Sequence, residues 1–364
     1  MQELFDLENI INTPPFSLHS KEKRELYVNA LLEMTLHHYN HCPEYKKILD
    51  NIRFNPQNIK DVTDFPFIPV RLFKEYELLS VKKEDVVKTM TSSGTSGQRV
   101  SKIFLDKATS TNQTKVLSKI VSSFTGKKRL PMLIIDSSTV VKDRNLFSAR
   151  GAGILGFSML GYDMTYALDE NMKIDLNLIN AFIERHKDES ILMFGFTFMI
   201  WEHFYKELKQ HKIKFSLEDG ILIHGGGWKK LISQAIDNAS FKKSLNEVCG
   251  IKNVYNYYGM VEQTGSIFME CEAGHLHASI FSDIIIRDFK DFRSLGAGET
   301  GLIQLLSLLP SSYPGHSILS EDLGELLGED NCSCGRKGKY FKIHGRIQNA
   351  EIRGCSDTYE SKQR

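Results

Sequence analysis

Leu130-Pro131-Met132-Leu133-Ile134-Ile135-Asp136 is the stretch that decides the fold of this 364-residue chain. It is a short apolar run that ends on a polar residue, which is typical of a strand buried on both faces. Three similar runs follow it, at residues 190–195, 220–225 and 252–257. Helical patterns lie between the runs, at residues 175–186, 201–211 and 231–249. This alternation predicts an α/β fold in which helices cover a parallel sheet.

A smaller β-rich part is expected after the parallel layer. Residues 282–287 and 301–306 are strand-like, and the glycine-rich turn between them predicts an antiparallel pair. Near the start, residues 19–50 carry apolar side chains at helical spacing, and the two prolines within 65–70 favour an extended connector. We therefore expect four regions, namely a helical region at 1–80 packed on the core, an α/β core at 81–270, a β-rich subdomain at 271–344, and a mobile tail at 345–364.

Composition excludes several classes of protein. The chain has 46 basic and 45 acidic residues, a formal net charge of +1, so no global field favours a nucleic-acid partner or an anionic lipid surface. The longest apolar stretch, at 191–201, is too short to span a membrane. The first residues lack a secretory pattern, and six cysteines over this length do not resemble a disulfide framework. We therefore expect a cytoplasmic protein.

A loop rich in serine, threonine and glycine precedes the strand-like residues 101–105. The backbone N–H groups and hydroxyls of such a loop can surround phosphate oxygens. The loop matches neither the Walker pattern nor the dinucleotide fingerprint, and the alternative is a plain solvated turn. The phosphate-binding interpretation assigns the role to Thr91, Ser92, Ser93, Gly94, Thr95, Ser96 and Gly97.

Further candidate site residues follow the predicted strands, where open parallel sheets collect their ligands. Gly225, Gly226 and Gly227 remove every Cβ from one wall, so a flat ring such as adenine could approach the backbone. Tyr258 could stack on that ring, and Glu262 could hold a magnesium ion that bridges phosphates. Each also has a simpler interpretation as a glycine turn, a core tyrosine or a solvated glutamate.

Taken in chain order, these segments resemble the motifs of the adenylate-forming superfamily, which includes acyl- and aryl-CoA ligases and firefly luciferase. The loop at 91–97 is similar to its Ser/Thr/Gly-rich motif, and Tyr258-Gly259-Met260-Val261-Glu262 to its Tyr-Gly-x-x-Glu motif. Glu321-Asp322-Leu323-Gly324 is similar to its acidic ribose motif, and Gly345-Arg346 to its Gly-Arg hinge. Four motifs in the same order are a specific signal.

The resemblance implies a role for each matched residue. It implies that ATP is bound by the loop, the three glycines, Tyr258 and Gly259, and that Asp322 contacts the ribose hydroxyls. It also implies that Glu262 contacts Mg²⁺ and that Arg346 contacts the phosphate or the ribose, which makes both residues catalytic.

A closer resemblance is to the acyl-protein synthetases of the LuxE type, the fatty-acid-activating components of bacterial luminescence reductase complexes. It is carried by residues 91–95, by Gly225-Gly226-Gly227-Trp228-Lys229, and by Arg353-Gly354-Cys355-Ser356. Residues 258–265 and 345–354 look more like phenylacetate-CoA ligases. We therefore expect a LuxE-like relative, and not necessarily a luminescence protein.

The tail suggests where the acyl group goes. Superfamily members carry after the hinge a mobile domain of roughly a hundred residues, the size of a small folding unit, whereas 18 residues follow Arg346 here. We expect that domain to be absent. Cys355 lies in the tail, and Arg353 and Arg346 would favour its thiolate, which attacks a mixed anhydride readily. The family resemblance implies that Cys355 accepts the acyl group; the alternative is an inert tail thiol.

The expected activity is therefore ATP-dependent conversion of a carboxylic acid, by resemblance a fatty acid, into acyl-AMP. Cys355 would take the acyl group and pass it to a partner, either an acyl reductase or an acyl carrier protein. One alternative is a ligase that uses free CoA. Another is an inactive nucleotide-binding scaffold, because Gln348 and Asn349 stand where relatives commonly have acids.

A second metal site is suggested by the spacing of cysteines and histidines. Three thiolates and one imidazole make a closed tetrahedral zinc site. The alternative is a set of ordinary cysteines, because Cys-x-Cys is tighter than the usual finger spacing. Analogy with phenylacetate-ligase-like proteins favours His277 over His275 as the imidazole ligand. The expected zinc ligands are thus Cys271, His277, Cys332 and Cys334.

Overall fold

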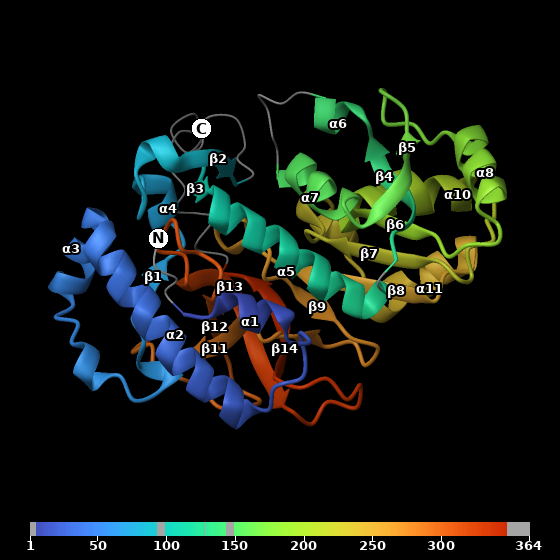
Figure 1. Ribbon diagram of the computed structural model, residues 1–364. Coiled ribbons are helices and arrows are strands. Elements are labelled where there is room, and N and C mark those ends of the chain that lie inside the picture. The colour runs from blue at the N-terminus through green and yellow to red at the C-terminus, as the bar shows by residue number, and fades with distance from the viewer. Residues whose placement is uncertain (1–4, 93–98, 127, 143–148, 348–364) are drawn as a thin grey trace, which may run out of the picture. The chain divides into compact units, whose positions relative to one another are not determined.

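The computed structural model describes residues 5–92, 99–126, 128–142 and 149–347 (Figure 1). They form two compact units. The second unit consists mainly of Leu117–Tyr258, and the first unit consists mainly of the residues before and after that range. Among the described residues, no helix has both the length and the apolar character needed to cross a membrane.

The second unit is built on a parallel sheet, which confirms the α/β prediction. Its strands are hydrogen-bonded in the order β5-β4-β6-β7-β8, and each neighbouring pair runs parallel. All four predicted runs are strands, and β5 adds an edge strand. The bounds are β4 Leu130–Ser137, β5 Gly161–Leu168, β6 Leu192–Phe196, β7 Ile221–Gly225 and β8 Asn253–Tyr258.

Helices pack their apolar sides on this sheet around a core that includes Phe182, Phe204 and Phe241. Capping side chains fix where two of them begin: Asp175 accepts from Leu178 N at 2.9 Å, and Asp237 accepts from Ser240 N at 2.9 Å. The helices are α6 Thr139–Lys142, α7 Ala149–Ser158, α8 Leu176–Arg185, α9 Thr197–Met199, a π-helix at Ile200–Tyr205, α10 Lys206–Gln210, a 3₁₀ segment at Lys229–Gln234 and α11 Asn238–Cys249.

The first unit contains an antiparallel sheet, in the strand order β11-β12-β13-β14-β10. The expected antiparallel pair is β11 and β12. A separate hairpin, β2 with β3, flanks the serine-rich loop. The strands of this unit are β1 Ile68–Pro69, β2 Val86–Thr91, β3 Lys102–Asp106, β10 Leu276–His277, β11 Ser282–Arg287, β12 Thr300–Ser307, β13 Ser317–Glu329 and β14 Lys339–Arg346. Most of the short strand β9, Phe268–Glu270, belongs to the second unit.

The helix expected at 19–50 is two helices, because Cys42 adopts an extended conformation and Pro43 starts the second helix at its first position. The connector at 65–70 is extended, and its two-residue strand β1 pairs with β13. The helical segments are α1 Leu7–Asn12, α2 Ser20–His41, α3 Pro43–Asn51, α4 Leu72–Glu75 and α5 Lys107–Thr125, with 3₁₀ turns at Pro56–Asn58, Val62–Asp64, Lys83–Asp85 and Val261–Gln263.

Two buried histidines stack in the first unit. The rings of His38 and His316 lie 4.9 Å apart, His38 contacts Ser80 Oγ and Pro310 O at 2.8 and 3.0 Å, and His316 Nε2 lies 3.0 Å from Thr35 Oγ1. Burial lowers the pKa of His38 well below its ordinary value and that of His316 to about 3. Both side chains are therefore neutral in the folded protein at neutral pH.

We expect this pair to make the fold sensitive to acid. Below pH 6.5 the unfolded chain binds protons on these imidazoles and the folded chain does not, so the free energy of unfolding falls as pH drops from about 6.5 toward 3. Between pH 7.5 and 5.5 the loss should be about 1 kcal/mol per histidine. The raised pKa of Glu262 acts in the opposite direction.

Thermal unfolding at the two pH values checks this expectation. His316→Gln should unfold at a lower temperature at pH 7.5 and show a smaller acid shift than the unsubstituted chain. An equal shift in both proteins would contradict the assignment to His316.

Candidate functional site

Ser92 and Ser101, which flank the serine-rich loop, are hydrogen-bonded to each other at the end of the β2–β3 hairpin. Ser101 N donates to Ser92 Oγ at 2.9 Å, and Ser92 N donates to Ser101 O at 3.2 Å. Thr91 pairs with Lys102 in the adjacent register position. The loop therefore starts and ends at a fixed point of the first unit. Five of its predicted phosphate ligands lie outside the described residues, namely Ser93, Gly94, Thr95, Ser96 and Gly97.

Glu262 is a buried carboxylate, only 5% exposed, in the 3₁₀ turn Val261–Gln263. Tyr313 fixes its backbone, because the Tyr313 hydroxyl donates to Glu262 O at 2.9 Å. Gln263 anchors the same turn by donating to Leu305 O and Gly315 O at 3.1 and 2.8 Å. The turn is thus rigidly placed in the first unit.

Burial raises the pKa of Glu262, and the Ser101 hydroxyl and the charges of Lys74 and Arg346 oppose that rise. A carboxylate whose ionised form is disfavoured by burial gains the most from a bound cation. The burial of the Glu262 carboxylate is therefore compatible with the predicted Mg²⁺ contact, since that ion binds through one or two carboxylates and completes its shell with substrate oxygens.

Asp322 and Arg346 face each other on β13 and β14. They occupy paired register positions, and Arg346 Nε donates to Asp322 Oδ1 at 3.1 Å. The Asp322 side chain is 11% exposed, whereas that of Arg346 is 60% exposed. Ser320 Oγ accepts from Asp322 N at 3.2 Å and orients the strand at this point. A nearly buried acceptor beside an exposed cation suits a ligand with both hydroxyls and phosphates.

Asp322→Asn should raise the KM for ATP about tenfold, because a hydrogen bond to a charged group contributes about 1.5–3 kcal/mol and the variant loses that charge. Initial rates at varied ATP concentration measure the effect. Glu321→Gln, at the neighbouring position on β13, is the control and should leave KM unchanged. If the two variants had the same KM, Asp322 would not be a nucleotide ligand.

The three glycines lie at the carboxyl end of β7 in the second unit. A Cβ on Gly225 would lie 2.7 Å from the Tyr257 ring, and a Cβ on Gly226 would lie 2.5 Å from the Phe196 ring. Gly226 and Gly227 have positive φ values of 79° and 64°, which favour glycine. The protein's own aromatic rings thus occupy the space beside the first two glycines, and the position of a Cβ on Gly227 is open.

Tyr258 ends β8 and is half-buried, and Gly259 follows it where a Cβ would meet Ile267 Cγ2 at 3.0 Å. The sequence did not predict that the rings of Phe196 and Tyr257 lie beside the first two of the three glycines, because their placement depends on the register of β6, β7 and β8. It also did not single out Ser101 as a neighbour of Glu262.

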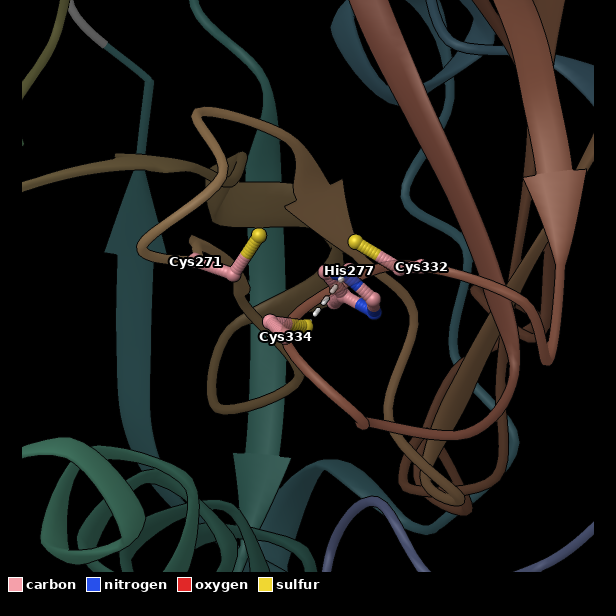
Figure 2. Close-up of side chains that lie close together, drawn as sticks. All are labelled: Cys271, His277, Cys332 and Cys334. Carbon is pink, nitrogen blue, oxygen red and sulfur yellow. Dashed lines mark hydrogen bonds between the residues drawn. The ribbon is translucent and has the colours of Figure 1, made fainter.

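Figure 2 shows Cys271, His277, Cys332 and Cys334 converging on one point. One ligand atom from each lies within 4.8 Å of every other, and all but Cys334 are buried. Cys334 Sγ lies 3.4 Å from His277 Nε2. The structure therefore brings together the four side chains predicted as zinc ligands. Cys355, the predicted acyl acceptor, lies outside the described residues.

The chain is similar to known proteins over its full length. Residues 2–363 match the family model described as "Acyl-protein synthetase, LuxE". A long-chain-fatty-acid–luciferin-component ligase of Aliivibrio fischeri is 24% identical over 97% of this chain and 92% of that protein. The ligase of the same name from Vibrio harveyi is 21% identical, and the match covers 92% of this chain and 88% of that protein.

Among solved structures, a 2-hydroxyisobutyryl-CoA ligase has the same fold. Its TM-score is 0.70 at 14% identity, and the match covers 92% of this chain and 72% of that chain. This likeness confirms the predicted adenylate-forming fold. The match of the family model across the chain and the shared fold lead to one conclusion: the chain belongs to the LuxE family of acyl-protein synthetases and is an ATP-dependent ligase.

Proposed function

We propose that this protein activates a long-chain fatty acid with ATP, holds the acyl group as a thioester on Cys355 and passes it to a partner protein. The observation that carries the proposal is the grouping of Glu262, Asp322, Arg346 and the loop flanked by Ser92 in one compact unit. The names of the curated relatives, which are ligases of long-chain fatty acids, support the choice of substrate.

In the first step a fatty carboxylate oxygen attacks the α-phosphorus of ATP, the bond to the β-phosphate oxygen breaks, and pyrophosphate leaves. Asp322 accepts hydrogen bonds from the ribose hydroxyls, and Arg346 stabilises the charge that develops on the phosphate. Glu262 would hold Mg²⁺, and the ion would supply positive charge beside the phosphate oxygens. The loop at 91–97 donates N–H and hydroxyl hydrogen bonds to the departing pyrophosphate.

In the second step the Cys355 thiolate attacks the acyl carbonyl carbon, a C–S bond forms, and AMP leaves with the electron pair of the C–O bond. Cys355 lies nine residues beyond Arg346. Nine extended residues span at most about 30 Å, so chain length allows the thiol to meet an adenylate bound at Arg346. A thiol on the partner then takes the acyl group by exchange, and Cys355 is regenerated.

The partner would be an acyl reductase, because the relatives are named as ligases of a luciferin component, or otherwise an acyl carrier protein. The second candidate function is a fatty acyl-CoA ligase, which the fold shared with a CoA ligase favours. The third candidate function is an inactive nucleotide-binding scaffold.

ATP–pyrophosphate exchange over a panel of carboxylic acids, with and without CoA, separates these functions. The proposal expects exchange that depends on a long-chain acid and Mg²⁺, protein-bound acyl groups without CoA, and no release of acyl-CoA. Acyl-CoA formation without protein acylation would favour the CoA ligase. Absence of exchange with every acid would favour the scaffold.

A further inference from the structure

The cluster of Cys271, His277, Cys332 and Cys334 is separate from the residues assigned to ATP and the acyl group. Its members come from two places in the chain, the segment that leads from β9 into β10 and the loop that joins β13 to β14. The four side chains offer three sulfur atoms and one imidazole nitrogen, all within 4.8 Å of one another. Two of the three thiols, those of Cys271 and Cys332, are buried, and the third is half-buried.

The distances suit a single metal ion. In a tetrahedral site with Zn–S distances of about 2.3 Å, the sulfur atoms lie about 3.8 Å apart. The ligand atoms of this cluster lie within 4.8 Å of one another, so a small inward shift would bring them to that spacing. No disulfide joins any of the cysteines within residues 5–92, 99–126, 128–142 and 149–347, so a disulfide does not account for the grouping. Iron–sulfur clusters commonly use four thiolates, whereas three thiolates and one imidazole form a closed structural zinc site. The three cysteines and one histidine of this cluster therefore favour zinc.

The backbone around the cysteines adds an independent observation, because two turns of the same form present them. Gly274 N donates to Cys271 O at 2.9 Å, and Gly335 N donates to Cys332 O at 3.0 Å. In each turn the glycine follows the cysteine by three residues and has a positive φ, 80° and 82° respectively. Two unrelated segments thus adopt the same Cys-x-x-Gly turn and point their thiols at a common centre (Figure 2).

We propose that Cys271, His277, Cys332 and Cys334 bind one structural zinc ion that closes the β13–β14 hairpin. His277 belongs to β10, which pairs with β14, and the two later cysteines lie in the hairpin loop. The same hairpin carries Asp322 and Arg346 at its open end, about 25 Å away at the usual rise per residue. The ion therefore stabilises the two strands whose register places those side chains.

His275 is the informative comparison. Its Nδ1 lies 3.4 Å from Cys332 Sγ and its ring stacks on Tyr340 at 5.1 Å, so it borders the site without being one of the four converging groups. His277 is fully buried, and its ring also stacks on Tyr340. Replacement of each histidine by glutamine therefore tests the ligand set with closely matched changes.

Elemental analysis of the untagged protein, produced with zinc supplied, tests the proposal. We expect about one zinc per chain, lost in Cys332→Ser and His277→Gln and kept in His275→Gln and in Cys249→Ser, a buried cysteine outside the cluster. Metal content well below one per folded chain, stoichiometric iron in place of zinc, or full zinc in His277→Gln would overturn it.

If the substituted variants do not fold, the proposal can still be tested on the unsubstituted protein. A mercurial that blocks thiols should release the zinc, and cobalt bound in its place should give the visible bands of a tetrahedral thiolate site. Release should also lower the temperature of unfolding. Octahedral cobalt bands, or a folded protein indifferent to metal release, would count against a structural tetrahedral site. Because none of these readouts involves catalysis, they can fail independently of the proposed function.

Discussion

Cys355→Ser is expected to abolish stable acylation of the protein while leaving ATP–pyrophosphate exchange within about twofold of the unsubstituted enzyme. In the proposed mechanism the two activities separate, because adenylation uses the loop, Glu262, Asp322 and Arg346, whereas thioester formation needs the Cys355 thiolate. A serine hydroxyl has a far higher pKa than a thiol and no adjacent base is assigned to it, so attack on the adenylate should be negligible. Incorporation of labelled fatty acid into protein, compared with exchange, measures both.

The control is Ser356→Ala, a change next to Cys355 that removes no thiol. It should acylate normally. Cys249 offers a chemical contrast, because burial raises the pKa of its thiol to about 11 and should leave it unreactive. Undiminished labelling of Cys355→Ser would show that another residue accepts the acyl group.

Glu262→Gln is expected to lower the exchange rate by about a hundredfold or more, because a metal ion contributes several kcal/mol of charge stabilisation during phosphoryl chemistry. The substitution keeps the shape of a buried side chain that is 5% exposed and removes only its ability to become anionic. The defect should be partly relieved at high Mg²⁺ concentration. Exchange rates across a Mg²⁺ titration at constant ATP provide the measurement.

Glu329→Gln is a matched control for Glu262→Gln. Glu329 lies at the far end of β13 from Asp322, and burial raises its pKa as it does that of Glu262. This variant should keep the exchange rate and its Mg²⁺ dependence. If Glu262→Gln showed an unchanged Mg²⁺ dependence, the carboxylate would act on structure and not on the metal.

The parts of the fold that the sequence predicted well are those buried on both faces. β4, β6 and β7 are almost wholly buried, so their residues form uninterrupted apolar runs. β5 was missed because an edge strand leaves side chains such as Asp163 exposed. β13 and β14 were missed as strands because polar residues and glycines interrupt them, and their pairing is set by contacts distant in sequence.

The site was predictable where a motif carries the chemistry and not where packing does. Glu262 and Asp322 follow from spacing and resemblance, and the structure adds their burial and partners. The rings of Phe196 and Tyr257 beside the glycines depend on strand register, which a single sequence does not reveal. Convergence of the cysteines and His277 likewise depends on segments distant in sequence, since His277 and Cys334 are 57 residues apart.

Tandem mass spectrometry of the protein after incubation with ATP, Mg²⁺ and a long-chain fatty acid, without CoA, is the most direct test of the central claim. The account predicts one acyl group per chain, removable by hydroxylamine and located on the peptide that contains Cys355. An acyl group found on a different residue, or an unmodified chain accumulating free acyl-AMP, would contradict it.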